Sequence, residues 1–365
     1  GKIVTNGQAS VSVGSLDNTG GKLASQGVMT ATVQGSLNNT NGRLSSGTGL
    51  TAASGGQLIN AGGVIGAGGA VAGSTLGVNA SSIDNSGGAI TNLGNGATTI
   101  NGGSQIANGN AGNTSGMGSI SGNGNVTLNA TSVSNTQGGQ LSGANLQINA
   151  GNLDNTGGKI GNVANTTGDV GIGTGTLTGA NGQINASRNL SVTANTLAGG
   201  GTYSAVNDLS LNLQGNFTTS PNYAFKAGHD LSFTLPGTFS NGGALSAVNG
   251  LNINAGDIQN SGTLGAGGLL TTHSNTLTNT GTIVGGSASL NATQSLSNLG
   301  TTALIGATDS AGTLELLAPD IENRDDTTAT DTQAMTAIYG LGKVVLAGGK
   351  DGSGNYANAN LVRNQ

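Results

Sequence analysis

Hydrophobic and polar residues alternate in short stretches that recur along the chain. One stretch reads Leu-Gln-Ile-Asn-Ala at residues 146–150, and similar stretches occupy residues 126–130 and 251–255. Strict alternation places aliphatic side chains on one face of a β-strand and polar side chains on the other. We therefore predict short strands that each bury one aliphatic face and turn a polar face toward water.

A second pattern, here called the corner phrase, separates these strands. Residues 16–23 read Leu-Asp-Asn-Thr-Gly-Gly-Lys-Leu, and residues 153–160 repeat this phrase with a final Ile. Asn tolerates the left-handed backbone region and Gly enters it without steric cost, so the phrase predicts a strand, a tight corner and another strand. The Asp is expected to cap the turn. Looser copies occupy residues 37–44, 83–90, 133–141, 258–264 and 277–283.

The corner phrases return at intervals of about twenty residues. The interval is 21 residues from Leu16 to Leu37 and 19 residues from Ile258 to Leu277. This period is typical of one coil of a parallel β-helix, whereas a leucine-rich repeat needs a denser Leu pattern. The predicted fold class is all-β, a right-handed parallel β-helix (solenoid) of about 15–17 coils with roughly 20 residues per coil.

The composition supports a narrow core. Of 365 residues, 70 are Gly, while aromatic residues make up 2% and charged residues 7% of the chain. So little bulk would not fill a thick globular core, but a solenoid needs less because each coil covers the next. Disordered chains are usually rich in charge and Pro, and this chain has only 3 Pro.

Several classes of function are disfavoured. The chain has no Cys, which excludes disulfides, thiol catalysis and a Cys-based metal site. The net charge of −5 offers no basic footprint for nucleic acid. No apolar run is long enough to span a membrane, and no signal peptide is visible. Because residue 1 lies within the repeat pattern, the chain is expected to be an internal fragment.

The repeats predict one long region and a distinct tail. Residues 1–305 are expected to form the β-helix, with an irregular coil and a longer loop within 96–132. Residues 203–239 hold all four Phe of the chain together with Tyr203 and Tyr223. Their spacing of about one coil favours an aromatic ladder in or along the coil. The alternative is a surface patch for a sugar or receptor, with Tyr223 and Phe225 as candidate binding residues.

Residues 306–365 are predicted to be a less regular, acidic continuation. From residue 301 onward the chain carries 4 basic and 8 acidic residues, against 6 and 7 before it. A loop is expected to leave the coil at 324–332, and residues 334–346 are apolar enough to rejoin it. The loop is either a solvated excursion or a partner-binding segment, with Asp325 and Asp326 as candidate binding residues.

Few residues suggest chemistry. His229 and His273 are 44 residues apart, about two coils, and could share a face with Asp230 and Asp257. Most coils offer only Asn, Thr, Ser and Gln, so we predict no enzyme and no catalytic, cofactor-binding or metal site. A calcium-binding roll would need tandem Gly-Gly-x-Gly-x-Asp repeats, and the corner phrases continue differently.

The corner phrase at 16–23 and 153–160, with the Leu-x-Ile-Asn-Ala stretches between corners, resembles the repeats of the filamentous haemagglutinin family. These are large bacterial exoproteins exported by two-partner secretion, and they include adhesins and contact-dependent growth inhibition effectors. The resemblance covers most of 1–305. Residues 307–323 resemble the region where such repeats pass into a receptor-recognising segment.

The resemblance implies a non-enzymatic filament or stalk that is secreted and displayed outside the outer membrane. It also implies an outer-membrane two-partner-secretion transporter as the export partner, and a receptor on a neighbouring or host cell. The expected form is a monomeric filament that neither spans a membrane nor binds nucleic acid. Two alternatives are a carbohydrate-binding or carbohydrate-cleaving β-helix and a repetitive surface layer without a fixed fold.

Overall fold

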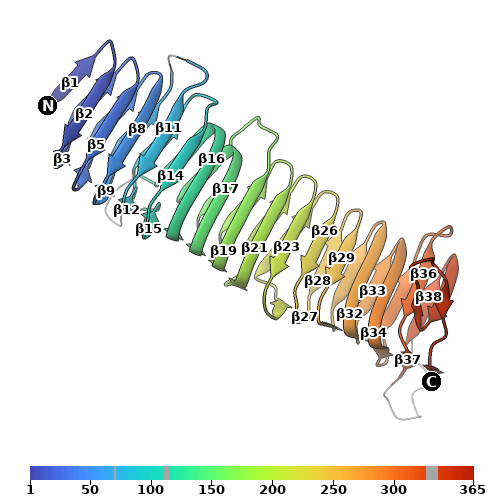
Figure 1. Cartoon of the computed structure of the whole chain (residues 1–365). Helices are drawn as coiled ribbons and strands as arrows, with labels where there is room; N and C mark the ends of the chain where they lie inside the picture. The colour runs from blue at the N-terminus through green and yellow to red at the C-terminus, as the bar shows by residue number, and fades with distance from the viewer. Residues whose placement is uncertain (70, 111–115, 326–335) are drawn as a thin grey trace. The chain divides into compact units, whose positions relative to one another are not determined.

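The computed structural model describes residues 1–69, 71–110, 116–325 and 336–365, and their regular secondary structure consists of β-strands (Figure 1). The chain divides into two compact units, Gly1–Ser204 (unit 1) and Ala205–Gln365 (unit 2). Each is a parallel β-solenoid, and the chain makes about 15 turns of roughly 21 residues. The predicted fold class, coil number and period are confirmed, while the handedness stays a prediction.

Each turn of unit 1 has three strand positions, which we call sides A, B and C in chain order. Side A holds β1 (Lys2–Thr5), β4 (Lys22–Ser25), β7 (Arg43–Ser46), β10 (Val64–Ala67), β13 (Ala89–Asn92), β18 (Lys159–Asn162), β20 (Gln183–Ala186) and β22 (Gly201–Ala205). Side B holds β2 (Ala9–Val13), β5 (Met29–Val33), β8 (Gly49–Ser54), β11 (Thr75–Asn79) and β14 (Thr98–Asn101). Side C holds β3 (Leu16–Asp17), β6 (Leu37–Asn38), β9 (Gln57–Ile59), β12 (Ser82–Asp84) and β15 (Gln105–Ala107). Longer strands cover several sides: β16 (Ser119–Ser134), β17 (Gln140–Asp154), β19 (Val170–Thr178) and β21 (Leu190–Ala198).

Unit 2 repeats this plan. Side A holds β25 (Tyr223–Ala227), β28 (Ala244–Ala247), β31 (Thr263–Ala266), β33 (Thr282–Gly285), β35 (Leu304–Ala307) and β38 (Ala337–Gly340). Side B holds β23 (Leu209–Leu213), β26 (Leu231–Thr234), β29 (Leu251–Asn254), β36 (Thr313–Leu317) and β39 (Lys343–Ala347). Side C holds β24 (Phe217–Thr219), β27 (Thr238–Asn241), β30 (Asp257–Asn260), β37 (Asp320–Arg324) and β42 (Leu361–Asn364). Strands β32 (Leu269–Asn279) and β34 (Ser287–Leu299) cover sides B and C, and β40 (Gly349–Lys350) pairs antiparallel with β41 (Tyr356–Ala357).

Equivalent residues of successive turns pair in register. On side C of unit 1, Leu16 is opposite Leu37 and Leu37 is opposite Leu58. Leu37 and Leu58 are fully buried, and Leu153 is 1% exposed. Alternating residues on all three sides follow the same rule, so the core is a stack of aliphatic side chains inside the coil. The aliphatic interior predicted from the alternating stretches is therefore confirmed.

The corner Asn has a different role from the predicted one. Tolerance of the left-handed region is not needed there, because positive φ falls later in the phrase, as at Gly157 (φ 65°). The Asn side chain instead points into the coil: Asn135 and Asn155 are 0% exposed, and Nδ2 of Asn135 donates to Oδ1 of Asn155 at 2.8 Å. The ladder in unit 1 continues through Asn18, Asn39, Asn60, Asn85, Asn108, Asn135 and Asn155.

Unit 2 has an equivalent ladder with donor–acceptor distances of 2.7–2.8 Å, formed by Asn241, Asn260, Asn279, Asn298, Asn323 and Asn364. In both units the amide nitrogen also donates to backbone carbonyls, as Asn60 does to Gly63 and Ala89. The ladder thus gives corner carbonyls a further donor, since the carbonyl of Gly63 also accepts from the backbone N of Ala89 at 2.8 Å.

The second glycine of the corner phrase allows the turns to approach closely. A Cβ at Gly158 would lie 1.9 Å from the carbonyl oxygen of Asn135 in the preceding turn. No side chain fits in that space. The predicted capping role of the Asp is confirmed, since Oδ1 of Asp17 accepts hydrogen bonds from the backbone and hydroxyl of Thr19.

One predicted irregularity is present, because the separation between successive ladder residues rises to 27 from Asn108 to Asn135, the longest in unit 1. In unit 2, β38 pairs with β35 and β39 with β36, so the described part of 334–346 lies in the coil as predicted. The loop predicted for 324–332 does not begin at Arg324, which still pairs with Leu299, and residues 326–332 lie outside the described residues. The division at residue 305/306 stays a prediction.

Replacing Asn135 with Ala should destabilise the protein by about 2–4 kcal/mol, because Nδ2 of Asn108 and Oδ1 of Asn155 would each lose a partner in a buried site. The matched control is Asn149→Ala. Asn149 donates to Asn129 at 2.8 Å in the same region of unit 1, but this pair is exposed. The control should cost about 0.5 kcal/mol or less. Urea unfolding followed by circular dichroism measures both, and equal losses would contradict the ladder's role.

Candidate functional site

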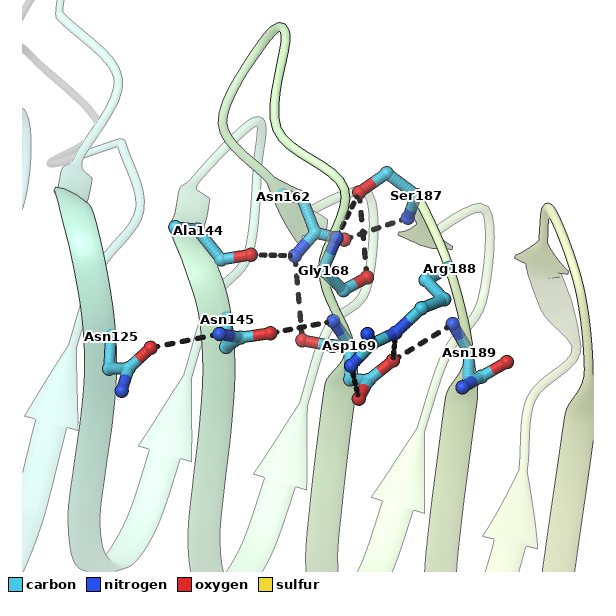
Figure 2. Close-up of polar contacts among 9 residues, drawn as sticks. All are labelled: Asn125, Ala144, Asn145, Asn162, Gly168, Asp169, Ser187, Arg188 and Asn189. Atoms are coloured by element: carbon cyan, nitrogen blue, oxygen red, sulfur yellow. Dashed lines mark hydrogen bonds and ion pairs between the residues drawn. The ribbon is translucent and has the colours of Figure 1, made fainter.

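A connected and partly exposed polar network lies at the corner between sides A and B of unit 1. Its column consists of the residues that directly precede side B: Asn125, Asn145, Asp169 and Asn189 (Figure 2). Nδ2 of Asn145 donates to Oδ1 of Asn125 at 2.9 Å, and Oδ1 of Asn145 accepts from the backbone N of Asp169 at 3.0 Å. Asn125 and Asn145 thus form an exposed amide pair, and Asp169 is the next residue of the column.

Arg188 holds the Asp169 carboxylate with two parallel hydrogen bonds. Nε donates to Oδ1 at 2.7 Å and Nη2 donates to Oδ2 at 2.5 Å. These bonds lower the pKa of Asp169 and raise that of Arg188. Both side chains remain partly exposed, at 43% for Asp169 and 46% for Arg188. Solvent therefore screens the pair, which joins two neighbouring turns by geometry more than by charge.

A loop above this pair is fixed by Asn162 and Ser187. Nδ2 of Asn162 donates to the carbonyl of Ala144 at 2.8 Å, and Oδ1 accepts from the backbone N of Ser187 at 2.8 Å. Oγ of Ser187 accepts from the backbone N of Gly168 at 2.9 Å. Figure 2 shows these contacts linking three successive turns beside Asp169. The corner is therefore preorganised rather than loose.

A groove runs along side B next to this corner. Its lining offers amides, hydroxyls and one carboxylate from Asn125, Thr127, Asn145, Gln147, Asp169, Asn189 and Ser191. Such groups can donate and accept hydrogen bonds with a polar ligand. None of these residues was predicted as a site residue, although the column of Asn125, Asn145, Asp169 and Asn189 directly before side B is visible in the repeat.

The aromatic residues of unit 2 form a connected cluster. Phe217 and Phe239 are register partners with ring centroids 6.2 Å apart, as their spacing predicted, and both are buried. Tyr223 and Phe225 are half-buried and stack on each other at 5.7 Å, while Phe217 contacts both rings. The aromatic ladder within the coil is thus present in unit 2, and a binding role for Tyr223 and Phe225 stays a prediction.

The acidic tail uses part of its charge internally. Glu315 pairs with Lys350 at 2.9 Å, and Glu322 pairs with Arg363 at 2.8 Å. The backbone N of Asp325 donates to the carbonyl of Gln365 at 3.2 Å, while Asp326 lies outside the described residues. A partner-binding role for these two Asp residues stays a prediction.

The histidines do not meet. His229 precedes side B, whereas His273 lies at the end of side B, in register with Asn254 and Asn291. Asp257 accepts a hydrogen bond from Thr276 at 2.6 Å. The suggested shared face of two His and two Asp residues is therefore not assembled.

Instead, His229 joins Asp230 and an acid that sequence reasoning missed, Asp208. Nδ1 of His229 lies 3.1 Å from Oδ1 of Asp208 and 3.3 Å from Oδ2 of Asp230. Asp208 could have been found from the repeat, because it occupies the same place before side B as Asp230, one turn earlier. These three are the group of metal-ligating side chains found within the part of the chain that the structure describes.

The fold and its polar corners define a segment of a repetitive parallel β-solenoid. The chain is 56% identical over all of its 365 residues to a protein named tRNA nuclease CdiA-2 from Burkholderia pseudomallei (strain 1026b), of which the match covers 12%. It is also 52% identical over 183 residues, 45% of the chain, to Toxin CdiA from Yersinia pestis, of which the match covers 6%.

The chain thus spans only a small part of the curated relatives it matches. No family model matches the chain, and no solved structure matches it significantly. Within the described residues, no helix is long and apolar enough to cross a membrane.

At pH values above about 4, Arg188→Ala should lower the free energy of unfolding of unit 1 by a small amount. This loss should shrink progressively as the pH is lowered. The pKa of Asp169 is lowered in the folded state, so its stabilisation is present above its unfolded pKa and is lost as the pH falls through the lower, folded pKa. The loss should be smaller than that for Asn135→Ala, because the pair is exposed.

Arg43→Ala serves as the control, since Nε of Arg43 donates to the hydroxyl of Ser45 at 3.3 Å and forms no ion pair with a carboxylate among the described residues. Urea midpoints of both variants between pH 2 and pH 7 measure the effect. A deficit in Arg188→Ala that does not shrink at low pH would contradict the ion pair as its cause.

Proposed function

We propose that this chain is a stalk segment of a secreted, contact-dependent growth inhibition exoprotein. One observation carries the proposal. All of this regular solenoid matches a small part of a much longer protein that is named CdiA-2. A solenoid has no intrinsic limit to its length, because each turn needs only its neighbours. Such a segment is suited to spacing functional parts of a long protein.

The coil chemistry suits folding after export. The chain has no Cys that could cross-link it before passage. The buried ladder is completed only when consecutive turns stack, as with Asn108, Asn135 and Asn155. A chain that leaves an outer-membrane two-partner-secretion transporter could therefore fold turn by turn outside the cell. This proposal places the segment at the bacterial surface, with a receptor on a neighbouring cell as the eventual partner.

The enzymatic activity in the relative's name is proposed to belong to other parts of such a protein. The relative is named as a tRNA nuclease, and the match covers 12% of it. The regular solenoid supports a structural, non-enzymatic role for this segment. Adhesion and toxin delivery could both use a stalk, and the names of the two relatives favour toxin delivery.

A deletion of one turn tests the stalk proposal in cells that produce the whole exoprotein. Removing residues 133–152 brings Leu153 into the place of Val133, its register partner. The remaining turns can then stack in phase, and we expect surface display and inhibition of neighbouring cells to stay near the parental level. Surface labelling and growth competition against a sensitive strain measure the two outcomes.

The control removes only residues 133–142, which shifts the following chain by about half a turn. This variant should lose the pairing of Asn108 with the next ladder residue and should be displayed poorly. If the in-phase deletion abolished inhibition while its surface level was unchanged, the deleted turn would have a specific role and the spacer proposal would be wrong.

A further inference from the structure

We propose that Asp208, His229 and Asp230 form a binding site for a divalent transition-metal ion, with Zn²⁺ as the representative. The inference goes beyond the stalk role and does not depend on it. The three side chains place one imidazole nitrogen and two carboxylate groups within 4.8 Å of one another on the surface of unit 2.

The fold fixes the three groups at the corners of two successive turns. The backbone N of His229 donates to the carbonyl of Asn207 at 3.0 Å, and the backbone N of Asp230 donates to Oδ1 of Asp208 at 3.1 Å. The following turn adds Asn249, whose backbone N donates to the carbonyl of His229 at 3.0 Å. The site is therefore built on hydrogen-bonded backbone, which limits the reorganisation needed to bind an ion.

The spacing of the donor atoms matches a small ion. Nδ1 of His229 is 3.1 Å from Oδ1 of Asp208 and 3.3 Å from Oδ2 of Asp230. Bonds of about 2.0–2.1 Å from tetrahedral zinc to nitrogen and oxygen place neighbouring ligand atoms about 3.3–3.4 Å apart. The nitrogen donor favours zinc and its neighbours in the first transition row over Ca²⁺ and Mg²⁺, which prefer oxygen ligands.

The next turn orients one of the ligands. Oδ1 of Asp230 accepts hydrogen bonds from Nδ2 of Asn249 at 2.7 Å and from the backbone N of Gly250 at 2.8 Å. This leaves Oδ2 directed at His229. Outer hydrogen bonds of this kind hold a ligating carboxylate in place.

Charge and space also favour an ion. Two carboxylates converge on the imidazole of His229, and a divalent cation would offset both negative charges. Asp208 and Asp230 also line a groove on side B with Ser232, Asn252 and Thr271. Water in that groove could complete the coordination shell.

Titration of the 365-residue chain with Zn²⁺ alone, by isothermal calorimetry in a non-chelating buffer at pH 7.5, tests the site. We expect one saturable ion per chain. His229→Ala and Asp208→Asn should each weaken binding at least about tenfold. A hundredfold excess of Ca²⁺ should not displace Zn²⁺.

His273→Ala is the matched control, because His273 lies between Asn254 and Asn291 in register and should leave the affinity unchanged. Circular dichroism melts confirm that each variant is folded, which is expected for exposed side chains. In the same melts, Zn²⁺ should raise the melting temperature of the parent chain but not of His229→Ala. Absence of one-to-one binding, or equal affinity in His229→Ala, would overturn the proposal.

Discussion

The corner asparagine is the constraint on which the rest of the solenoid depends. A buried amide is costly unless its donors and acceptor are paired, and here the partners belong to the turns on either side. Asn135 illustrates this, since it accepts from Asn108 and donates to Asn155. No turn can therefore satisfy its own corner. The aliphatic stack tolerates exchange among Leu, Ile and Val, whereas the amide specifies which residues must be level with one another.

Stacking in register also accounts for the unusual composition. When equivalent residues lie directly above one another, a charge that recurred in every turn would face its own copy, which is unfavourable. Amides avoid this problem because each is both donor and acceptor, as the exposed pair Asn129 and Asn149 shows. Several ionic contacts between turns have opposite signs, including Asp169 with Arg188 and Glu315 with Lys350. A content of only 7% charged residues follows naturally from this arrangement.

The architecture could be predicted from the sequence for two reasons. The period of the corner phrase gives the number of residues per coil, and the alternation of hydrophobic and polar residues shows which side chains of a strand face the interior. The Leu residues that begin the corner phrases, such as Leu37 and Leu58, are buried register partners as the spacing required. The direction of the corner Asn was not predictable in the same way, since Asn is equally common in exposed turns. Asp208 was missed, although the repeat places it one turn before Asp230. The structure was needed to show that the side chain of His229 lies between these two acids. No repeated pattern in the sequence predicts whether Tyr223 and Phe225 bind a ligand, because most other coils have no aromatic residue.

The asparagine ladder also gives the solenoid a chemical polarity along its axis. In both units each amide nitrogen points to the turn that follows in the chain, as from Asn39 to Asn60 and from Asn260 to Asn279. This orientation is chemically determined, because the same nitrogen also faces backbone carbonyls that can only accept. One end of a ladder thus presents an oxygen and the other an NH₂ group. Two identical ends cannot complement each other, so any growth of the stack by further turns has to proceed head to tail.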